Sequence, residues 1–171
     1  MTLIVSPLSQ LERVIAARAP SHLVTLMDPA SLIDTPAGVA PERHLKLGVN
    51  DIVEAAEGRT CPDEGVVLRL VEFGRGWDGA RPLLVHCWAG ISRSTAAAFA
   101  LACARNPQTS ELSIARALRS ASAKAHPNRR IVHLADDLLG RRGRMADAIE
   151  AIGPGETAEE NQPFDLPALY R

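Results

Sequence analysis

Residues 83–94 read Leu-Leu-Val-His-Cys-Trp-Ala-Gly-Ile-Ser-Arg-Ser, and this stretch decides both the fold and the chemistry of the chain. An apolar run ends at Cys87, a short segment containing Gly90 follows, and the alanine-rich residues 95–103 come soon after Arg93. This order predicts a buried strand, a tight loop and a helix. The loop therefore has one thiol at its start and one guanidinium at its end.

Such a loop is suited to binding a tetrahedral oxyanion. Successive backbone amides in a tight turn form a concave anion site, and the N-terminus of the following helix adds unpaired amides. Arg93 can bind two oxygens of the anion at once, which a lysine cannot. Beside these positive groups Cys87 is expected to be a thiolate at neutral pH, and therefore a nucleophile. Ser94 can donate a hydrogen bond to the sulfur when it must leave again.

The sequence His86-Cys87, five residues, Arg93-Ser94 resembles the signature of cysteine-dependent protein tyrosine phosphatases, and the short chain resembles their dual-specificity branch most. The resemblance covers roughly residues 43–139. It implies that Cys87 attacks phosphorus and forms a cysteinyl-phosphate intermediate, without a cofactor or a metal ion. It also implies a set of phosphate-binding residues: Trp88, Ala89, Gly90, Ile91, Ser92 and Arg93.

The mechanism needs a second group, an acid that protonates the leaving group and then takes a proton from water. The candidates are Asp28, Asp34, Asp51, Asp63 and Asp78. Asp51 is favoured because it follows a predicted strand and lies 36 residues before Cys87, a position similar to that of the acid in the dual-specificity family. Asp63 is the alternative, because Pro62-Asp63 faintly resembles the Pro-Asp of larger tyrosine phosphatases.

The resemblance also implies two supporting residues. His86 would lie beneath the loop, where its ring orders the loop around Cys87 and favours the thiolate. Pro127-Asn128 resembles the Pro-Asn pair that follows the long helix of the family and braces the active-site loop. Trp88 either shapes the rim of the pocket or packs against it.

Length and composition favour one domain at residues 1–152, followed by a tail at 153–171. The net charge of −1 gives no sign of a nucleic-acid surface. The 3 cysteines are odd in number and lack metal-binding spacing, which favours a reducing compartment. No segment is apolar enough to predict a signal peptide or a membrane span. We therefore expect a cytoplasmic protein, and the richness in alanine and arginine weakly suggests a bacterial source.

Strands and helices alternate along the first two thirds of the chain, and the last third is helical. This order predicts an α/β three-layer sandwich with a central, mostly parallel sheet flanked by helices, and a site at the carboxyl ends of the strands. Strands are expected at residues 3–6, 21–27, 43–49 and 81–86. Helices are expected at residues 7–19, 64–73, 92–105, 110–125, 129–139 and 145–152.

The substrate is less well defined by the sequence than the reaction. The side chains of the predicted loop are uncharged between Cys87 and Arg93, which favours a substrate with a single phosphate. Such a substrate is a protein carrying phosphotyrosine, or phosphoserine or phosphothreonine, or a small phosphate monoester. Phosphate, sulfate and vanadate are expected to inhibit. Three alternatives stay open: an inositol phosphate phosphatase, a module that binds phosphate esters without turnover, and a rhodanese-like sulfurtransferase.

Overall fold

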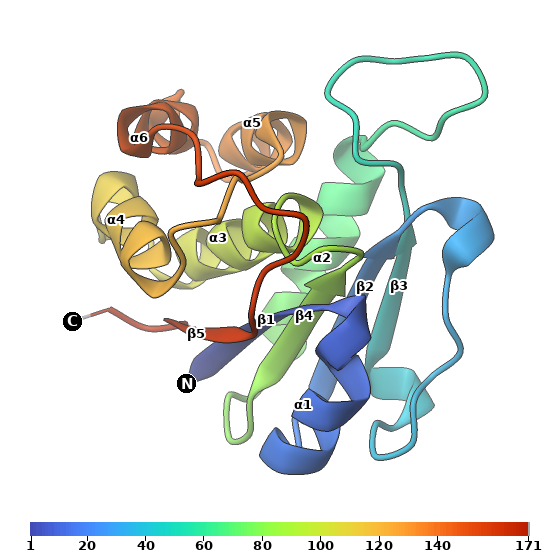
Figure 1. The fold of residues 1–171 in the computed structure, drawn as a ribbon. Coiled ribbons are helices and arrows are strands. Elements are labelled where there is room, and N and C mark those ends of the chain that lie inside the picture. Colours follow the sequence, from blue (N-terminus) through green and yellow to red (C-terminus); the bar gives the residue numbers. More distant parts are fainter. Residues whose placement is uncertain (171) are drawn as a thin grey trace.

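The computed structural model describes residues 1–170, and its centre is a five-stranded sheet with the order β3-β2-β4-β1-β5 (Figure 1). Strands β1 to β4 are parallel, and β5 pairs with β1 in the antiparallel direction. The bounds are β1 Thr2–Pro7, β2 His22–Met27, β3 His44–Gly48, β4 Leu83–Cys87 and β5 Phe164–Pro167. The predicted α/β fold with a mostly parallel sheet is confirmed.

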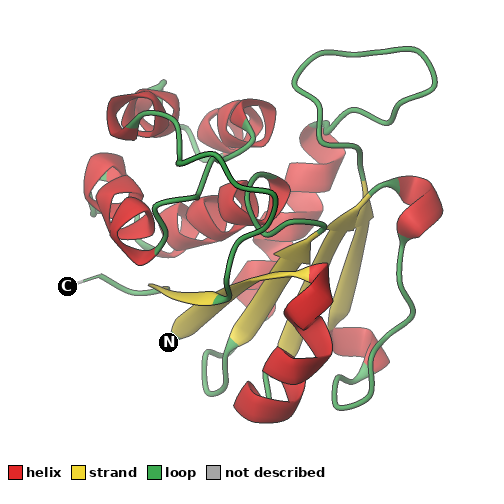
Figure 2. Ribbon diagram, in the orientation of Figure 1, coloured by secondary structure: helices red, strands yellow, loops and turns green. Residues whose placement is uncertain are grey.

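Helices cover both faces of this sheet (Figure 2). Helix α1 (Leu11–Arg18) packs on one face, together with neighbouring residues of the sheet such as Ile4. The next residue toward the N-terminus, Leu3, belongs to the larger core on the opposite face, because successive side chains of a strand point to opposite sides. That face is covered by α2 Glu64–Gly76, α3 Arg93–Arg105, α4 Glu111–Ala121, α5 Arg129–Leu138 and α6 Arg144–Ile152.

Strand β4 and helix α3 form the centre of the molecule. Every residue of β4 is buried, and α3 is buried continuously from Arg93 to Cys103. A helix that is surrounded on all sides can be packed this tightly because many of its side chains are the small ones of alanine. The loop between β4 and α3 therefore connects two rigid, buried elements. It lies where the carboxyl ends of the four parallel strands meet.

The structure differs from the expectation in three segments. Residues 7–19 begin as a 3₁₀ turn before α1, and α4 ends at Ala121 because Ser122 has an extended backbone. The segment predicted as a tail contributes β5, a strand whose four residues are too few to show a pattern in the sequence. Arg171 lies outside the described residues. Within residues 1–170, no helix has the length and apolar character needed to cross a membrane.

Candidate active site

The thiol of Cys87 lies at the last position of β4 and is almost completely buried. Its Sγ is 3.1 Å from Oγ of Ser94, the second residue of α3, which is buried as well. The structure thus brings the two side chains together across the loop that separates them. We call residues 88–92 the phosphate loop, after the role that the sequence predicts for them.

Gly90 allows the phosphate loop to pack directly against the end of β1. Its φ angle is +70°, a conformation that residues with a side chain rarely adopt. A Cβ atom at this position would lie 2.8 Å from the backbone nitrogen of Pro7. Both the backbone angle and the close approach therefore require glycine here.

Three carbonyl groups of the phosphate loop are held from outside by backbone amides. Leu8 donates to the carbonyl of Trp88 over 3.0 Å, and His126 donates to that of Ile91 over 2.9 Å. Asn128 donates through its backbone to the carbonyl of Ser92 over 3.2 Å. Residues from two distant parts of the chain, after β1 and before α5, thus fix the direction of these three peptide groups.

The other two carbonyls are held by Asn161, which the sequence analysis did not identify. Its backbone amide donates to Ala89 over 2.9 Å, and its Nδ2 donates to Gly90 over 3.0 Å. Asn161 lies between α6 and β5, some 70 residues beyond the loop. No motif surrounds it, so the sequence contains no signal that would have identified it.

The orientation of the carbonyls determines the orientation of the amides. A peptide group is planar and trans, so that a carbonyl and the following N–H point in opposite directions. Because the carbonyls of residues 88–92 all point outward, the amides that follow them point into the loop. None of the amides of residues 88–93 donates to an acceptor among residues 1–170. The phosphate loop is therefore a concave array of unpaired donors at the N-terminus of α3, the arrangement that binds anions.

Arg93 is oriented by contacts on one side of its guanidinium. Nη1 donates to Oδ1 of Asp28 and to the carbonyl of Val49, both over 2.7 Å. The side chain is nearly buried, and its Nε has no hydrogen-bond partner within residues 1–170. Asp28 follows β2 and Val49 follows β3, so residues at the C-terminal ends of two neighbouring strands hold the guanidinium in place. The group retains a buried donor that an anion could accept from.

Asp51 lies beside the phosphate loop, as predicted. Its Oδ1 accepts from Oγ of Ser92 over 2.7 Å and from Nδ2 of Asn128 over 2.8 Å. Asn50 pairs with Thr60 through two hydrogen bonds and so closes the base of the long loop that Asp51 begins. Oδ1 is thus anchored, while Oδ2 has no partner among the described residues and is exposed with the rest of the side chain.

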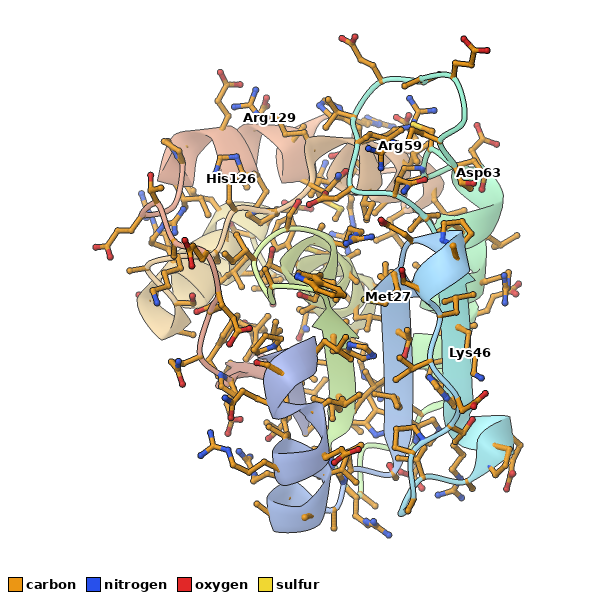
Figure 3. The ribbon with its side chains drawn as sticks, turned by 45° about the vertical axis from the view of Figure 1, so that its right-hand side comes forward. Met27, Lys46, Arg59, Asp63, His126 and Arg129 are labelled. Carbon is orange, nitrogen blue, oxygen red and sulfur yellow. The ribbon has the colours of Figure 1, made fainter. Side chains whose placement is uncertain are left out.

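The structure gives most other aspartate candidates different contacts. Asp63 lies at the start of α2 (Figure 3), where its Oδ1 caps the helix by accepting from the amide of Val66. Asp78 accepts from the amide of Ala80 in a turn before β4. Asp28 forms an ion pair with Arg93, and Asp34 lines a surface cavity near α1. Among the candidates, Asp51 is the carboxylate that contacts a phosphate-loop side chain.

His86 lies under the loop in a chain of hydrogen bonds. Its Nε2 is 2.7 Å from Oγ1 of Thr25, which is 2.8 Å from Nε2 of His44. Burial lowers the pKa of His86 to about 4, and the positive charge of Arg93 contributes to this shift. Burial and the charge of Lys46 lower the pKa of His44 to about 4. Both imidazoles are therefore neutral at pH 7 and can share the Thr25 hydroxyl as donor and acceptor.

A cavity of about 490 Å³ opens next to Asp51 and Ser92. The loop that begins with Asp51 forms one wall, and the residues around the start of α5 form the other. His126 and Arg129 lie on this second wall (Figure 3). Trp88 is 63% exposed, so its ring is free to contact a bound molecule. The cavity has the size of a small-molecule or side-chain pocket.

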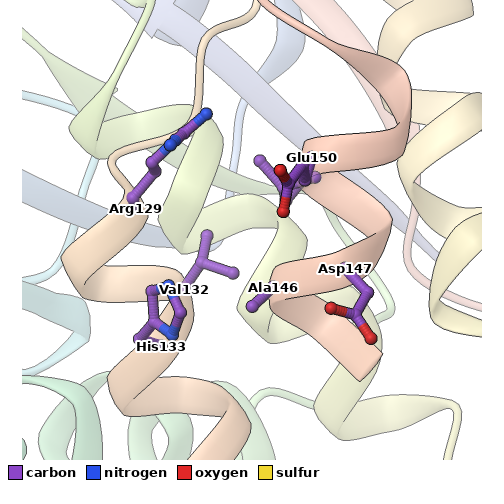
Figure 4. A pocket seen from close by; sticks show the side chains of 7 residues that line it. Arg129, Val132, His133, Ala146, Asp147 and Glu150 are labelled. Carbon is purple, nitrogen blue, oxygen red and sulfur yellow. The ribbon is translucent and has the colours of Figure 1, made fainter. Parts of the chain in front are cut away.

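A second, smaller cavity of about 110 Å³ lies between α5 and α6 (Figure 4). Charged side chains of both helices surround it, including Arg129, Asp147 and Glu150. It contains no residue of the phosphate loop. Within residues 1–170, no group of three or more histidine, cysteine, aspartate or glutamate side chains is arranged to hold a metal ion.

The fold resembles that of solved phosphatases over most of the chain. DUSP15 matches with a TM-score of 0.61 and 17% identity, covering 91% of this chain and 94% of that chain. PTPMT1 in complex with PI(5)P matches with a TM-score of 0.61 and 15% identity, covering 88% and 93%. The human tyrosine phosphatase-like serine/threonine/tyrosine-interacting protein matches with a TM-score of 0.61 and 21% identity, covering 82% and 92%.

The chain therefore has the fold of the dual-specificity and tyrosine phosphatases, and at the level of the fold the resemblance stated from the sequence is confirmed. No protein-family model matches the sequence, and no curated protein matches it significantly. At these identities the likeness concerns the fold, and the chemistry has to be argued from the residues of this chain.

Proposed function

We propose that the protein is a phosphatase that hydrolyses phosphomonoesters through a cysteinyl-phosphate intermediate. The observation that carries this proposal is the array of unpaired amides in the phosphate loop, with the sulfur of Cys87 at its base. A dianionic phosphoryl group is an acceptor for such an array. Arg93 and the amides of residues 88–93 stabilise the equatorial oxygens in the transition state.

The proposed mechanism assigns one residue of the site to each step. The Cys87 thiolate attacks phosphorus, and the phosphorus–oxygen bond to the leaving group breaks. Asp51 gives its proton to the leaving oxygen through the free Oδ2. In the second step Asp51 takes a proton from water, which attacks phosphorus and releases the sulfur. Ser94 donates a hydrogen bond to that sulfur, from which its Oγ is 3.1 Å away.

We further propose phosphotyrosine in a protein as the substrate, with other phosphomonoesters as alternatives. The loop side chains between Cys87 and Arg93 are uncharged, so they offer no cation for a second phosphate. The cavity beside Asp51 has room for an aromatic leaving group.

Hydrolysis of p-nitrophenyl phosphate by the purified wild type and by Cys87→Ser tests the proposal. We expect turnover in the wild type and none above background in Cys87→Ser, because a serine hydroxyl is not ionised at neutral pH. Cys87→Ser should still bind phosphate, since the amides and Arg93 remain. Phosphate binding without turnover in the wild type would instead identify a binding module. Turnover of thiosulfate and cyanide would identify a sulfurtransferase.

A panel of phosphopeptides, phosphoinositides and nucleotides then determines the substrate class. We expect phosphotyrosine peptides to give the highest kcat/KM. A clear preference for phosphoinositides would contradict the proposed substrate, although it would leave the cysteinyl-phosphate chemistry intact.

A further inference from the structure

Asn161 is a buried residue on a segment that crosses the outside of the phosphate loop. Figure 1 shows this segment, in red, running from α6 past the start of α3 to β5. It is fastened to the turn after α4, where the amide of Glu156 donates to the carbonyl of Ala123 over 2.9 Å. The side chain of Asn161 also contacts Oγ of Ser122, which lies 2.9 Å from its Nδ2.

One residue thereby orients two consecutive peptide groups of the phosphate loop. Its backbone amide holds the carbonyl of Ala89 and its Nδ2 holds that of Gly90. Because each peptide group is planar, these bonds turn the amides of Gly90 and Ile91 toward the anion site. The backbone bond survives any substitution except proline, so that a change of side chain removes the bond to the second peptide group and leaves the bond to the first.

That second peptide group is the one most able to rotate. It follows Gly90, whose backbone has more conformational freedom than any other residue. The carbonyls of Trp88, Ile91 and Ser92 are held by backbone amides, whereas the bond to the carbonyl of Gly90 comes from a side chain. Rotation of this group would replace an amide donor with a carbonyl oxygen, which repels a phosphoryl oxygen.

We infer that Asn161 is a positioning residue of the active site, which holds the amide of Ile91 toward the phosphate through the carbonyl of Gly90. This inference rests on the proposed function and adds to it a residue from outside the motif. Asn161 itself does not touch the phosphate. Its effect is expected on oxyanion binding and on turnover.

Asn106 provides a matched control. It is also a buried asparagine that fastens the C-terminal segment, because its Nδ2 donates to the carbonyl of Ala168 and its Oδ1 accepts from the amide of Tyr170. It lies at the opposite end of α3 from the phosphate loop. Asn106→Ala therefore reports what is lost when the C-terminal segment is loosened without a direct contact to the loop.

The experiment compares the wild type with Asn161→Ala, Asn161→Asp and Asn106→Ala. Inhibition of p-nitrophenyl phosphate hydrolysis by orthovanadate measures oxyanion binding, and the thermal midpoint measures stability. We expect orthovanadate to bind about tenfold more weakly to both Asn161 variants, the size of effect that one buried hydrogen bond produces. The loss should be greater in Asn161→Asp, whose carboxylate faces the carbonyl of Gly90. Asn106→Ala should lower the thermal midpoint and keep the wild-type affinity.

Wild-type vanadate affinity in both Asn161 variants would overturn the inference, and so would an equal loss in Asn106→Ala. If Asn161→Ala does not fold, the vanadate affinity of Asn161→Asp decides the question, because aspartate has nearly the same shape as asparagine. Calorimetric titration of inorganic phosphate into the same variants separates this inference from the proposed function. If the wild type binds phosphate but hydrolyses nothing, the proposed function fails, and the order of phosphate affinities still tests Asn161.

Discussion

The inner and outer sides of the phosphate loop are built from different parts of the chain. The inner side consists of Cys87, the loop amides and Arg93, all within residues 87–93. The outer side consists of hydrogen bonds from Leu8, His126, Asn128 and Asn161, which come from three distant segments. The groups proposed to react are thus neighbours in the sequence, whereas the groups that orient them are neighbours only after folding.

The comparison separates two kinds of effect that a substitution can have. Under the proposed function, a change on the inner side removes a group that touches the phosphate, so it should abolish most of the transition-state stabilisation. A change on the outer side leaves every such group in place and alters its direction, so the loss should be partial. Substitutions on the two sides of the loop test this division.

Arg93→Lys should cause the largest loss among them. Lysine keeps the positive charge but lacks the planar pair of donors that fits two phosphate oxygens. It also cannot reproduce the contacts of Nη1 with Asp28 and Val49. We expect kcat/KM for p-nitrophenyl phosphate to fall about 10³-fold or more. A rate close to that of the wild type would show that the guanidinium does not contact the phosphate.

Asp51→Asn should lower turnover by about 10²–10⁴-fold, the usual contribution of a positioned acid and base. The loss should be greater for alkyl than for aryl phosphates, because an alkoxide needs its proton more than a phenoxide does. If Asp51 is the acid, the falling limb of the pH–rate profile should flatten in this variant, because asparagine has no proton to lose.

Asp63→Asn is the control for this prediction. Asparagine caps a helix as well as aspartate does, so α2 should keep its stability and the enzyme should keep its pH profile. If the falling limb instead vanishes in Asp63→Asn and survives in Asp51→Asn, Asp63 is the acid.

Asn128→Asp tests the hydrogen bond between the outer side of the loop and Asp51, which Asn128 donates through its Nδ2. An aspartate can still cap α5 by accepting from the amide of Ile131, and its backbone can still donate to Ser92. It replaces the donor to Asp51 with a second negative charge, which should move the Asp51 carboxylate away. We expect kcat to fall about tenfold, equivalent to roughly 1.4 kcal/mol, with little change in the thermal midpoint. An unchanged kcat would mean that Asn128 does not position Asp51.

The two buried histidines beneath the phosphate loop, His86 and His44, should make the stability of the fold depend on pH. The imidazoles of His86 and His44 have folded-state pKa values lowered to about 4, against 6.5 in the unfolded chain. The unfolded state therefore binds more protons than the folded state between these pH values. The contribution of the two neutral imidazoles to the free energy of unfolding is fully present above about pH 6.5 and is lost as the pH falls to about 4. The loss for His86 alone is about 3 kcal/mol.

Urea unfolding at pH 7, 5.5 and 4.5 measures this dependence. His86→Gln should show a smaller loss of unfolding free energy on acidification than the wild type. His133→Gln changes an exposed imidazole and is the control. Identical pH dependence in the wild type and in His86→Gln would contradict the assignment of His86 as a neutral, buried support.

Much of the architecture could be predicted because its signals are local. An apolar run followed by glycine and an alanine-rich segment was enough to predict β4, the phosphate loop and α3, and all three are present. The resemblance to the dual-specificity family favoured Asp51 by its position after a strand, and in the structure Asp51 contacts Ser92 of the loop, since the carboxyl ends of parallel strands meet at one edge of the sheet. Its role as the acid stays a prediction.

The sequence alone determined the proposed chemistry of the phosphate loop, because a thiol, a set of amides and a guanidinium that are to act on one anion must lie within a single turn. It also determined the central strand β4, whose residues are apolar enough to be buried on both faces of the sheet. Only the tertiary structure decided which residues turn the loop amides inward. Hydrogen bonds between a loop and residues some 70 positions away leave no periodic or compositional pattern, so Asn161 and strand β5 became visible only once the chain was folded.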